Sequence, residues 1–369
     1  MQKSICHITV LNPVTHTRIF YKLALSQQLL GFQVSIIGRG EENAYRTEKE
    51  MHLYHIRYFR RLALKRFAYA FYILPRAIKI RADIYTLHSP ELLGLGYFLK
   101  IFLKARIIYD VHEDYAANIR GGRHYPRWLR HPLARLIRSW ERLAMRWVDA
   151  VSYAETCYDN MLGAKNVFVL PNTFQAAASN SDISLSLPEH PYLLYSGTIA
   201  KEWGLFEAIE IWESLTALRP FELVIAGHTH QGDLLEDLQE RIQASSYSSR
   251  IHVVGGRQYV PYADILHLIR HCEMGMGLYH LLPHIQDKIP TKFYEYMAAD
   301  KPLLYSPNPV WKTFDAEHRL GIGWEKTMDA DELLQHLDAW KTSPPEHDPS
   351  SYAWEEALVQ NMLKSILKR

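Results

Sequence analysis

Two carboxylates stand eight positions apart in the last quarter of the chain, and their spacing suits a phosphorylated ligand. Asp287 and Glu295 flank Pro290 and Thr291, residue types favoured in the first turn of a helix. Free N–H groups and the positive end of the helix dipole attract phosphate there. The two acids could then hold a sugar hydroxyl and a ribose on either side of a diphosphate. A capped surface helix with scattered charges is the alternative, because one short motif is weak evidence.

A second candidate is the turn after a strand in the middle of the chain, which includes Gly197, Thr198 and Lys201. Glycine lets a phosphate approach the backbone, and Lys201 could neutralise a diphosphate as a mobile point charge. An ordinary strand-to-helix turn with a solvated lysine is the alternative. No Gly-x-Gly-x-x-Gly occurs here or near 8–14, which argues against a dinucleotide-dependent oxidoreductase.

The glycine pair Gly255-Gly256 follows another strand-like run and precedes Tyr259. The glycines allow a tight turn, and backbone groups with Tyr259 could hold a nucleotide base. A loop that simply ends in a proline-started helix is the alternative.

Three polar residues, His112, Glu113 and Asp114, follow a strand-like run in the first half of the chain. His112 could hydrogen-bond a reacting sugar or share a proton, and the two acids compete for that role. A structural histidine is the alternative. Two other pairs, His228/His230 and His280/His284, lack a ligand cluster of recognisable spacing, so we expect no metal site.

Length, composition and charge limit the classes of protein to which the chain can belong. The chain has 369 residues, which predicts two domains, and it is 48% apolar and 22% charged, which is typical of a soluble globular protein. A net charge of +2 argues against a general nucleic-acid binder. Three scattered cysteines indicate a reducing compartment, and the first residues run straight into a strand without a signal peptide. We therefore expect a cytoplasmic protein.

Apolar strand-like runs alternate with helical patterns on both sides of a segment rich in Ala, Ser, Asn and Pro, 175–191. Near-continuous apolar strands predict parallel sheets buried on both faces. Each half is thus expected to be a doubly wound Rossmann-like α/β domain, and the two would face each other across a cleft. The expected boundaries are 1–174, a linker over 175–191, a second domain over 192–345 and a final amphipathic segment over 346–369.

The stretch from Ile119 to Trp147 holds eight Arg and one acid, interleaved with tryptophans. A basic, Trp-flanked amphipathic segment can lie on an anionic membrane surface. A core helix with a solvated basic face is the first alternative, and a nucleic-acid surface is the second. The apolar run from Leu92 to Tyr109 is interrupted by three basic residues, so we do not expect it to span a membrane.

Taken together, these motifs resemble those of GT-B glycosyltransferases, and within them the large retaining family of nucleotide-sugar enzymes called family 4. The resemblance rests on the order and spacing of four segments in the second half, and His112-Glu113 matches more loosely in the first half. The four segments are Ser196–Gly204, Val224–Gly227, the Gly255 loop and Ile289–Pro302.

The resemblance implies a role for each matching residue. Glu295 would hold the ribose of the donor nucleotide, Asp287 and His112 would contact the donor sugar, and Lys201 would bind the diphosphate with the amides around Thr291. It also implies no metal and no covalent intermediate, because the leaving diphosphate helps to deprotonate the acceptor. The final segment would cross back onto the first domain.

The chain departs from the family pattern at two of these positions. The family often has Arg where Thr198 stands, and Lys288 or Lys292 would be the nearby substitute. The first acid of the pair is Asp287 rather than Glu, one methylene shorter, which could alter the sugar preference.

We therefore expect a glycosyltransferase that moves a sugar from a nucleotide diphosphate sugar to a glycan or lipid-linked acceptor in cell-surface polysaccharide synthesis, peripheral on the inner face of the membrane. Two alternatives stay open. A nucleotide-sugar 2-epimerase of the same fold would need no acceptor. A catalytically degenerate subunit that binds a nucleotide sugar or a partner enzyme would explain Thr198.

Overall fold

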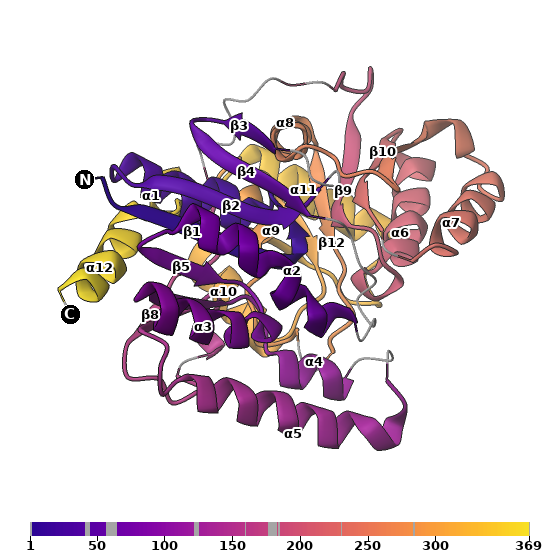
Figure 1. Cartoon of the computed structure of the whole chain (residues 1–369). Helices are drawn as coiled ribbons and strands as arrows, with labels where there is room; N and C mark the ends of the chain where they lie inside the picture. The colour runs from indigo at the N-terminus through magenta and orange to yellow at the C-terminus, as the bar shows by residue number, and fades with distance from the viewer. Residues whose placement is uncertain are drawn as a thin grey trace. The chain divides into compact units, whose positions relative to one another are not determined.

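The computed structural model describes residues 2–40, 45–56, 65–121, 125–158, 160–175, 183, 185–229, 231–282 and 285–368; within these ranges the side chains at 45–46, 65–71 and 349 are not described. The chain divides into two compact units (Figure 1). Unit 1 comprises Met1–Asn172 with Trp354–Arg369, and unit 2 comprises Thr173–Ala353.

Unit 1 is built on an eight-stranded sheet in the order β3-β4-β2-β1-β5-β6-β7-β8. Its neighbouring strands are parallel except for β3 and β4, which are antiparallel. The strands are β1 (Ser4–Pro13), β2 (Gln33–Arg39), β3 (Tyr45–Glu48), β4 (Met51–Ile56), β5 (Ile84–Leu87), β6 (Arg106–Val111), β7 (Ala150–Tyr153) and β8 (Val167–Val169).

Helices cover both faces of this sheet because its strands are apolar on both sides. Ile107 packs with α2, α3 and α5, whereas its neighbour Ile108 packs with α12, as the period of two in a strand requires. The helices are η1 (Arg18–Ala24, a π-helical turn), α1 (Leu25–Leu29), α2 (Lys65–Ile80), η2 (Pro90–Leu92), α3 (Leu93–Leu103), α4 (Tyr115–Gly121), α5 (Arg127–Ala144), η3 (Thr156–Tyr158) and α12 (Glu356–Leu367).

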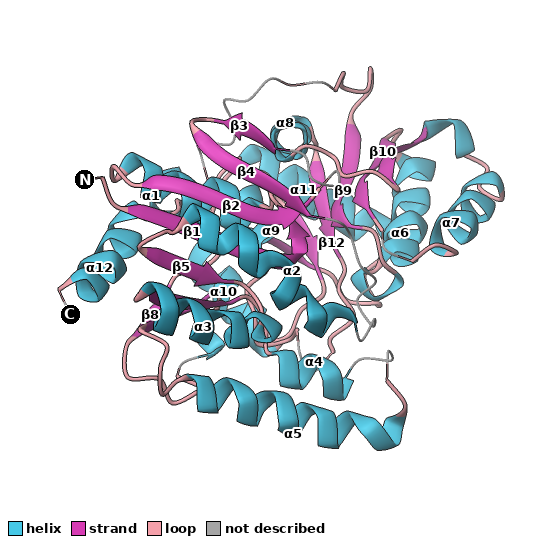
Figure 2. Cartoon of the chain, viewed as in Figure 1, coloured by secondary structure: helices cyan, strands magenta, loops and turns pink. Residues whose placement is uncertain are grey.

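Unit 2 repeats the arrangement with a six-stranded parallel sheet in the order β11-β10-β9-β12-β13-β14 (Figure 2). The strands are β9 (Tyr192–Thr198), β10 (Glu222–His228), β11 (Ile251–Gly256), β12 (Met274–Gly277), β13 (Leu303–Tyr305) and β14 (Gly321–Gly323). The helices are η5 (Lys201–Trp203), α6 (Leu205–Leu218), α7 (Leu234–Gln243), η6 (Ser248–Arg250), α8 (Tyr262–His271), α9 (Thr291–Met297), α10 (Pro309–His318), α11 (Ala330–Thr342) and η7 (Pro349–Tyr352).

The predicted fold class is confirmed: both units are parallel α/β sheets wound with helices, and the last helix, α12, returns to unit 1. Trp354 leads into that helix and donates a hydrogen bond from Nε1 to Ser26 Oγ, at 2.9 Å. None of the described helices has the length and apolar composition that a bilayer crossing requires.

Several elements were not expected from the sequence. Among the strands and α-helices they are β3, β4, α2, α4, α10 and β14. The strand β14 has three residues, two of them glycine, so it carries almost no pattern. The helix α10 has a mixed composition and is fixed instead by one buried side chain, Trp311, and by Asn308, whose side chain caps it through the Trp311 N–H.

Candidate functional site

The carboxyl ends of three neighbouring strands in unit 2 form a floor of glycines. Gly197, Gly227 and Gly255 stand side by side in register on β9, β10 and β11. A Cβ atom on Gly227 would lie 1.6 Å from the Gly197 carbonyl oxygen, and one on Gly255 would lie 2.3 Å from that of Gly227. The strand ends therefore stay bare, and a ligand can reach the backbone where α/β sheets bind their ligands. Gly227 belongs to the segment Val224–Gly227 of the family resemblance, but it was not predicted as a site residue.

The acidic pair lies around the start of α9, as its spacing predicts. Pro290 precedes the helix, Asp287 lies exposed in the preceding turn, and Glu295 is inside the helix with 7% of its surface exposed. Trp311 Nε1 donates a hydrogen bond to the Lys288 carbonyl oxygen at 2.7 Å, which fixes the turn that carries Asp287. The inner face of α9 is fully buried and consists of Phe293, Tyr296 and Met297.

Glu295 is held by a side chain that the sequence did not identify. Tyr262, the first residue of α8, donates a hydrogen bond from its hydroxyl to Glu295 Oε1 at 2.7 Å. Burial and the neighbouring carboxylate raise the pKa of Tyr262 well above its usual value, so the phenol stays a donor. This bond orients the carboxylate. Its only signal in the sequence is a tyrosine directly after Pro261, at a helix start near the carboxyl end of β11.

Lys292 connects α9 to the end of β9. Its ammonium donates a hydrogen bond to the Ser196 carbonyl oxygen at 2.8 Å and lies 5.1 Å from the ring centre of Tyr279. Burial lowers the pKa of Lys292 to about 8, while the charge of Glu295 acts in the opposite direction. The cation thus lies at the strand end where Thr198 lacks a charge.

Lys201 and Thr198 lie on the exposed turn between β9 and α6. The Lys201 ammonium pairs with Asp237 Oδ2 of α7 at 2.5 Å, and the two side chains are 52% and 45% exposed. An exposed pair of this kind contributes little stability. Lys201 can therefore exchange Asp237 for another anion at small cost.

Tyr259 follows β11 in the sequence, but its side chain lies against the end of β10. Its ring stacks on His228 with the ring centres 3.7 Å apart and the planes inclined by 30°. Tyr259 is 47% exposed, so the stack offers an aromatic surface on which a flat ring can lie.

In unit 1, His112 belongs to a buried cluster centred on Asp110. The Asp110 carboxylate accepts a bidentate pair of hydrogen bonds from Arg18 at 2.7 and 3.0 Å, one from Ser152 Oγ at 2.7 Å and one from His112 Nε2 at 2.8 Å. Burial alone would raise the pKa of Asp110, but the Arg18 charge and the histidine hydrogen bonds lower it well below its usual value. The carboxylate is therefore ionised and fixes the imidazole of His112.

A row of imidazoles extends from this cluster into the core. His88 Nδ1 lies 3.0 Å from His112 Nε2, His88 Nε2 lies 3.0 Å from His7 Nδ1, and His7 Nε2 lies 2.7 Å from Gln27 Oε1. Burial lowers the pKa of His88 to about 3 and that of His7 to about 4, so both rings are neutral at pH 7.

The two acids that competed with His112 have other partners. Glu113 Oε2 accepts a hydrogen bond from Asn118 Nδ2 at 2.6 Å. Asp114 Oδ1 accepts one from the Ala117 N–H at 2.8 Å, at the start of α4, and pairs with Arg138. Both acids thus hold the helices that follow β6.

The residues that could bind a metal ion differ from the two histidine pairs considered in the sequence analysis. Within the described ranges, His88, Asp110 and His112 could hold an ion, with their three donor atoms 2.8 to 3.2 Å apart. Two histidines and a carboxylate suit a transition metal, but Arg18 already neutralises Asp110 and would repel a cation. His280 pairs with Glu207 at 2.7 Å, and His230 and His284 lie outside the described residues.

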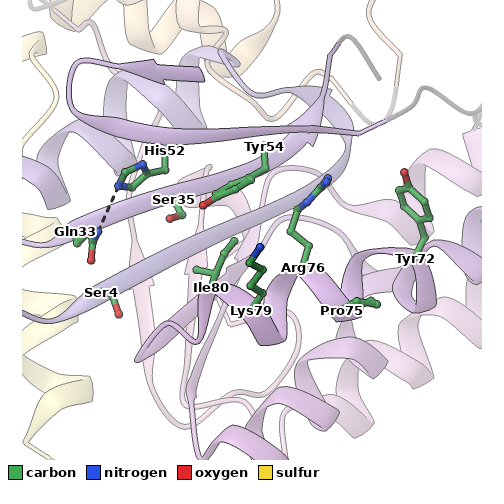
Figure 3. A pocket seen from close by; sticks show the side chains of 10 residues that line it. All are labelled: Ser4, Gln33, Ser35, His52, Tyr54, Tyr72, Pro75, Arg76, Lys79 and Ile80. Atoms are coloured by element: carbon green, nitrogen blue, oxygen red, sulfur yellow. Dashed lines mark hydrogen bonds between the residues drawn. The ribbon is translucent and has the colours of Figure 1, made fainter. Parts of the chain in front are cut away.

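A cavity of about 790 Å³ also lies in unit 1, away from these groups (Figure 3). Ser4, Gln33 and His52 place it at the amino ends of β1, β2 and β4, with Arg76 and Lys79 of α2 on its other wall. Ligands of open α/β sheets bind at the opposite, carboxyl ends. The cavity contains no residue of either cluster described above.

The chain matches two family models that together span most of its length. Residues 16–172 match the glycosyl transferase 4-like domain, and residues 178–355 match glycosyl transferases group 1. No curated protein sequence matches the chain significantly.

Solved structures with a similar fold include sucrose-phosphate synthase from Thermosynechococcus elongatus, with 14% identity, a TM-score of 0.61 and coverage of 100% of this chain and 94% of that one. A UDP-forming trehalose-phosphate synthase from Burkholderia xenovorans has 12% identity, a TM-score of 0.61 and coverage of 99% and 96%. The catalytic domain of starch synthase IV from Arabidopsis thaliana has 10% identity, a TM-score of 0.60 and coverage of 100% and 95%.

At these identities the structural likeness shows the GT-B fold, and the two family matches show the activity class. The predicted family is thereby confirmed. The chain belongs to the group 1 glycosyltransferases, enzymes that transfer a sugar from a nucleotide-sugar donor.

Proposed function

We propose that the protein is a retaining glycosyltransferase that moves a sugar from a nucleotide diphosphate donor to a glycan or lipid-linked acceptor in cell-surface polysaccharide synthesis. The observation that carries the donor assignment is the constellation at the carboxyl end of β9. There a glycine floor, the partly buried Lys292 and the oriented Glu295 come together in one unit. Nothing in this set depends on the placement of unit 1.

Each predicted residue has a place in this proposal. Glu295, oriented by Tyr262, binds the ribose hydroxyls, and the stacked Tyr259 lies against the base. The diphosphate lies over Gly197 and Gly255 near the amides around Thr291. Lys201 and Lys292 neutralise its charge, with Lys292 in place of the Arg that the family often has at Thr198. Asp287 contacts the donor sugar.

The chemistry needs positioning and charge neutralisation more than a covalent partner. The bond between the sugar and the diphosphate breaks, the acceptor hydroxyl bonds to the same face of the sugar, and its proton passes to the leaving phosphate oxygen. Two lysines stabilise the growing phosphate charge, so we propose that no metal takes part. His112, held by Asp110, contacts the donor sugar from unit 1.

We also propose that the enzyme works in the cytoplasm, peripherally on the inner face of an anionic membrane. The support is α5, on which Arg127, Arg135 and Arg142 are exposed beside Trp128 at 77% exposure. Lipid-linked acceptors are reached at such a surface.

A thermal-shift screen against nucleoside diphosphates and their sugars tests the donor assignment, and one base is expected to stabilise the protein selectively. With that donor, Glu295→Ala should abolish turnover in a protein that is still folded at the assay temperature. Glu236→Ala, an exposed glutamate on α7, is the matched control. Full activity of Glu295→Ala would contradict the assignment, and conversion of the donor to its epimer without an acceptor would replace transfer by epimerisation.

Treatment with a chelator tests the proposal that no metal takes part. Turnover should be unchanged after dialysis against EDTA. A loss that one divalent cation restores would point instead to the His88, Asp110 and His112 group.

A further inference from the structure

The outward surface of the helices on one face of the unit 1 sheet is apolar over α3. Tyr97, Phe98, Ile101 and Phe102 are 47%, 45%, 52% and 71% exposed, although the opposite side of the same helix packs into the core. These four positions form one stripe, because residues four apart share a side of a helix. A helix that is apolar all round is normally covered, and an exposed cluster of large apolar side chains marks an interaction surface.

A narrow apolar groove adjoins this stripe, between α2 and α3. It has a volume of about 260 Å³, and every residue that lines it is apolar: Leu74, Ile78, Phe98, Leu99, Phe102 and Leu103. A polar ligand would find no hydrogen-bond partner there, whereas a hydrocarbon chain needs none.

The charge of the three helices limits what can cover the stripe. Together α2, α3 and α5 carry ten Lys or Arg and one acid, Glu141. That acid is buried and accepts a hydrogen bond from the Tyr109 hydroxyl at 2.8 Å, so it does not offset the charge at the surface. Three arginines are exposed on α5, which packs on the same face of the sheet as α3: Arg127, Arg135 and Arg142.

These observations favour one occupant. A second copy docked on the same face would oppose two strongly basic surfaces, which electrostatic repulsion disfavours. A nucleic acid would use the basic residues but not a stripe of phenylalanines with a groove of carbon atoms. An anionic bilayer uses both, because its phosphates meet Lys and Arg while its acyl region accepts the apolar side chains.

We propose that the α2, α3 and α5 face docks on an anionic bilayer, that α3 inserts Phe98, Ile101 and Phe102 among the acyl chains, and that one lipid hydrocarbon chain enters the groove between α2 and α3. This proposal rests on the membrane association proposed above and assigns its main contact to α3 rather than to the arginine-rich α5. The arginines then hold the lipid headgroups while α3 supplies the apolar anchor.

Sedimentation with vesicles tests the anchor. The wild-type protein should bind vesicles of phosphatidylcholine with 30% phosphatidylglycerol and bind pure phosphatidylcholine weakly. Phe102→Glu combined with Ile101→Glu should lower the partition coefficient by at least about tenfold. Leu29→Glu, which changes a leucine of 68% exposure on α1 at the other face of the sheet, should bind like the wild type.

A lipid with a photoreactive acyl chain tests the groove. After irradiation of bound vesicles, peptides spanning 74–103 should carry the adduct, and Ile78→Trp, which fills the groove, should lower adduct formation several-fold while vesicle binding persists. Adducts confined to peptides of α5, or equal vesicle binding by the double glutamate variant and the wild type, would overturn the proposal. So would a shift from dimer to monomer in the double variant without vesicles.

The same variants separate this proposal from the donor assignment. Binding of the selected nucleoside diphosphate, measured by calorimetry without vesicles, should be unchanged in the double glutamate variant, which also shows that it is folded. If the wild type binds anionic vesicles but no nucleoside diphosphate, the proposed donor site is wrong and the proposed membrane-binding face is still supported.

Discussion

The carboxyl ends of the two sheets are built in opposite ways. In unit 2 the strands end on a bare row of glycines, and the nearby pair of Lys201 and Asp237 is half exposed. In unit 1 the corresponding edge is filled by Asp110 and His88, both fully buried and bonded to other side chains. An open floor suits a ligand that brings its own charge. A closed cluster suits the fixing of one side chain, His112.

The difference predicts how each region responds to substitution. Changes at Lys201 or Asp237 in unit 2 should alter ligand binding at nearly constant stability, because these two charged side chains are about half exposed. Changes in the Asp110 cluster should first alter stability, because they leave buried polar groups without partners.

The largest effect is expected for Asp110→Asn. Arg18 is 2% exposed and would lose a charge-balancing partner, so the free energy of unfolding should fall by about 3–5 kcal/mol in denaturant titrations. Ser152→Ala, which removes a single hydrogen bond from the same carboxylate, should cost about 1 kcal/mol. Nucleoside diphosphate affinity should stay within about twofold in both, at concentrations where the protein is folded. If either variant lost as much nucleoside diphosphate affinity as a variant of the unit 2 site, the two regions would not differ in the way described.

The next effect concerns Lys292, whose replacement by Met should weaken nucleoside diphosphate binding by about 10- to 100-fold, the value of a charge-assisted hydrogen bond. Because burial lowers its pKa to about 8, the lysine loses its proton as pH rises through that value. Wild-type affinity should therefore fall above pH 8, by up to about tenfold per unit.

Lys292→Arg is the control for the pH profile, since a guanidinium stays charged throughout this range. Its affinity, measured by calorimetry between pH 7 and 9.5, should be nearly independent of pH. An unchanged slope would assign the titration to another group.

A smaller effect is expected for Tyr262→Phe, which removes the hydrogen bond that orients Glu295. Discrimination between a ribonucleoside and a 2′-deoxyribonucleoside diphosphate should fall by about three- to tenfold. Tyr192→Phe removes a comparable buried bond, to the Leu268 carbonyl oxygen in the last turn of α8, and should leave that ratio unchanged. Equal discrimination in the wild type and both variants would show that Glu295 does not bind the ribose hydroxyls.

The smallest effect is expected for Asp237→Asn, which releases Lys201 from its exposed partner. Nucleoside diphosphate affinity should rise by about two- to threefold at low ionic strength and return to the wild-type value in 0.5 M salt, since salt screens exposed charges. A decrease in affinity would show that Asp237 itself takes part in binding.

The sequence predicted those parts of the site that lie within one continuous stretch. Asp287, Lys292 and Glu295 share a turn and a helix whose start is marked by Pro290, so their relative placement follows from local geometry.

The parts that escaped prediction depend on pairs far apart in the chain. Arg18 meets Asp110 across 92 positions, and Tyr262 meets Glu295 across 33. Asp110 and His112 did share a signal, since residues two apart on a strand face the same side and a carboxylate inside an apolar strand needs a partner. Which cation supplies that partner is set by strand order, which a single sequence does not reveal.

The return of α12 to unit 1 has a consequence for synthesis on the ribosome. All residues of unit 2 have been made once Ala353 is added, whereas unit 1 still lacks its last sixteen, 354–369. Five of those residues are buried in the core of unit 1: Trp354, Val359, Met362, Leu363 and Ile366. Unit 2 can thus complete its fold before unit 1 does, although unit 2 comes second along the chain.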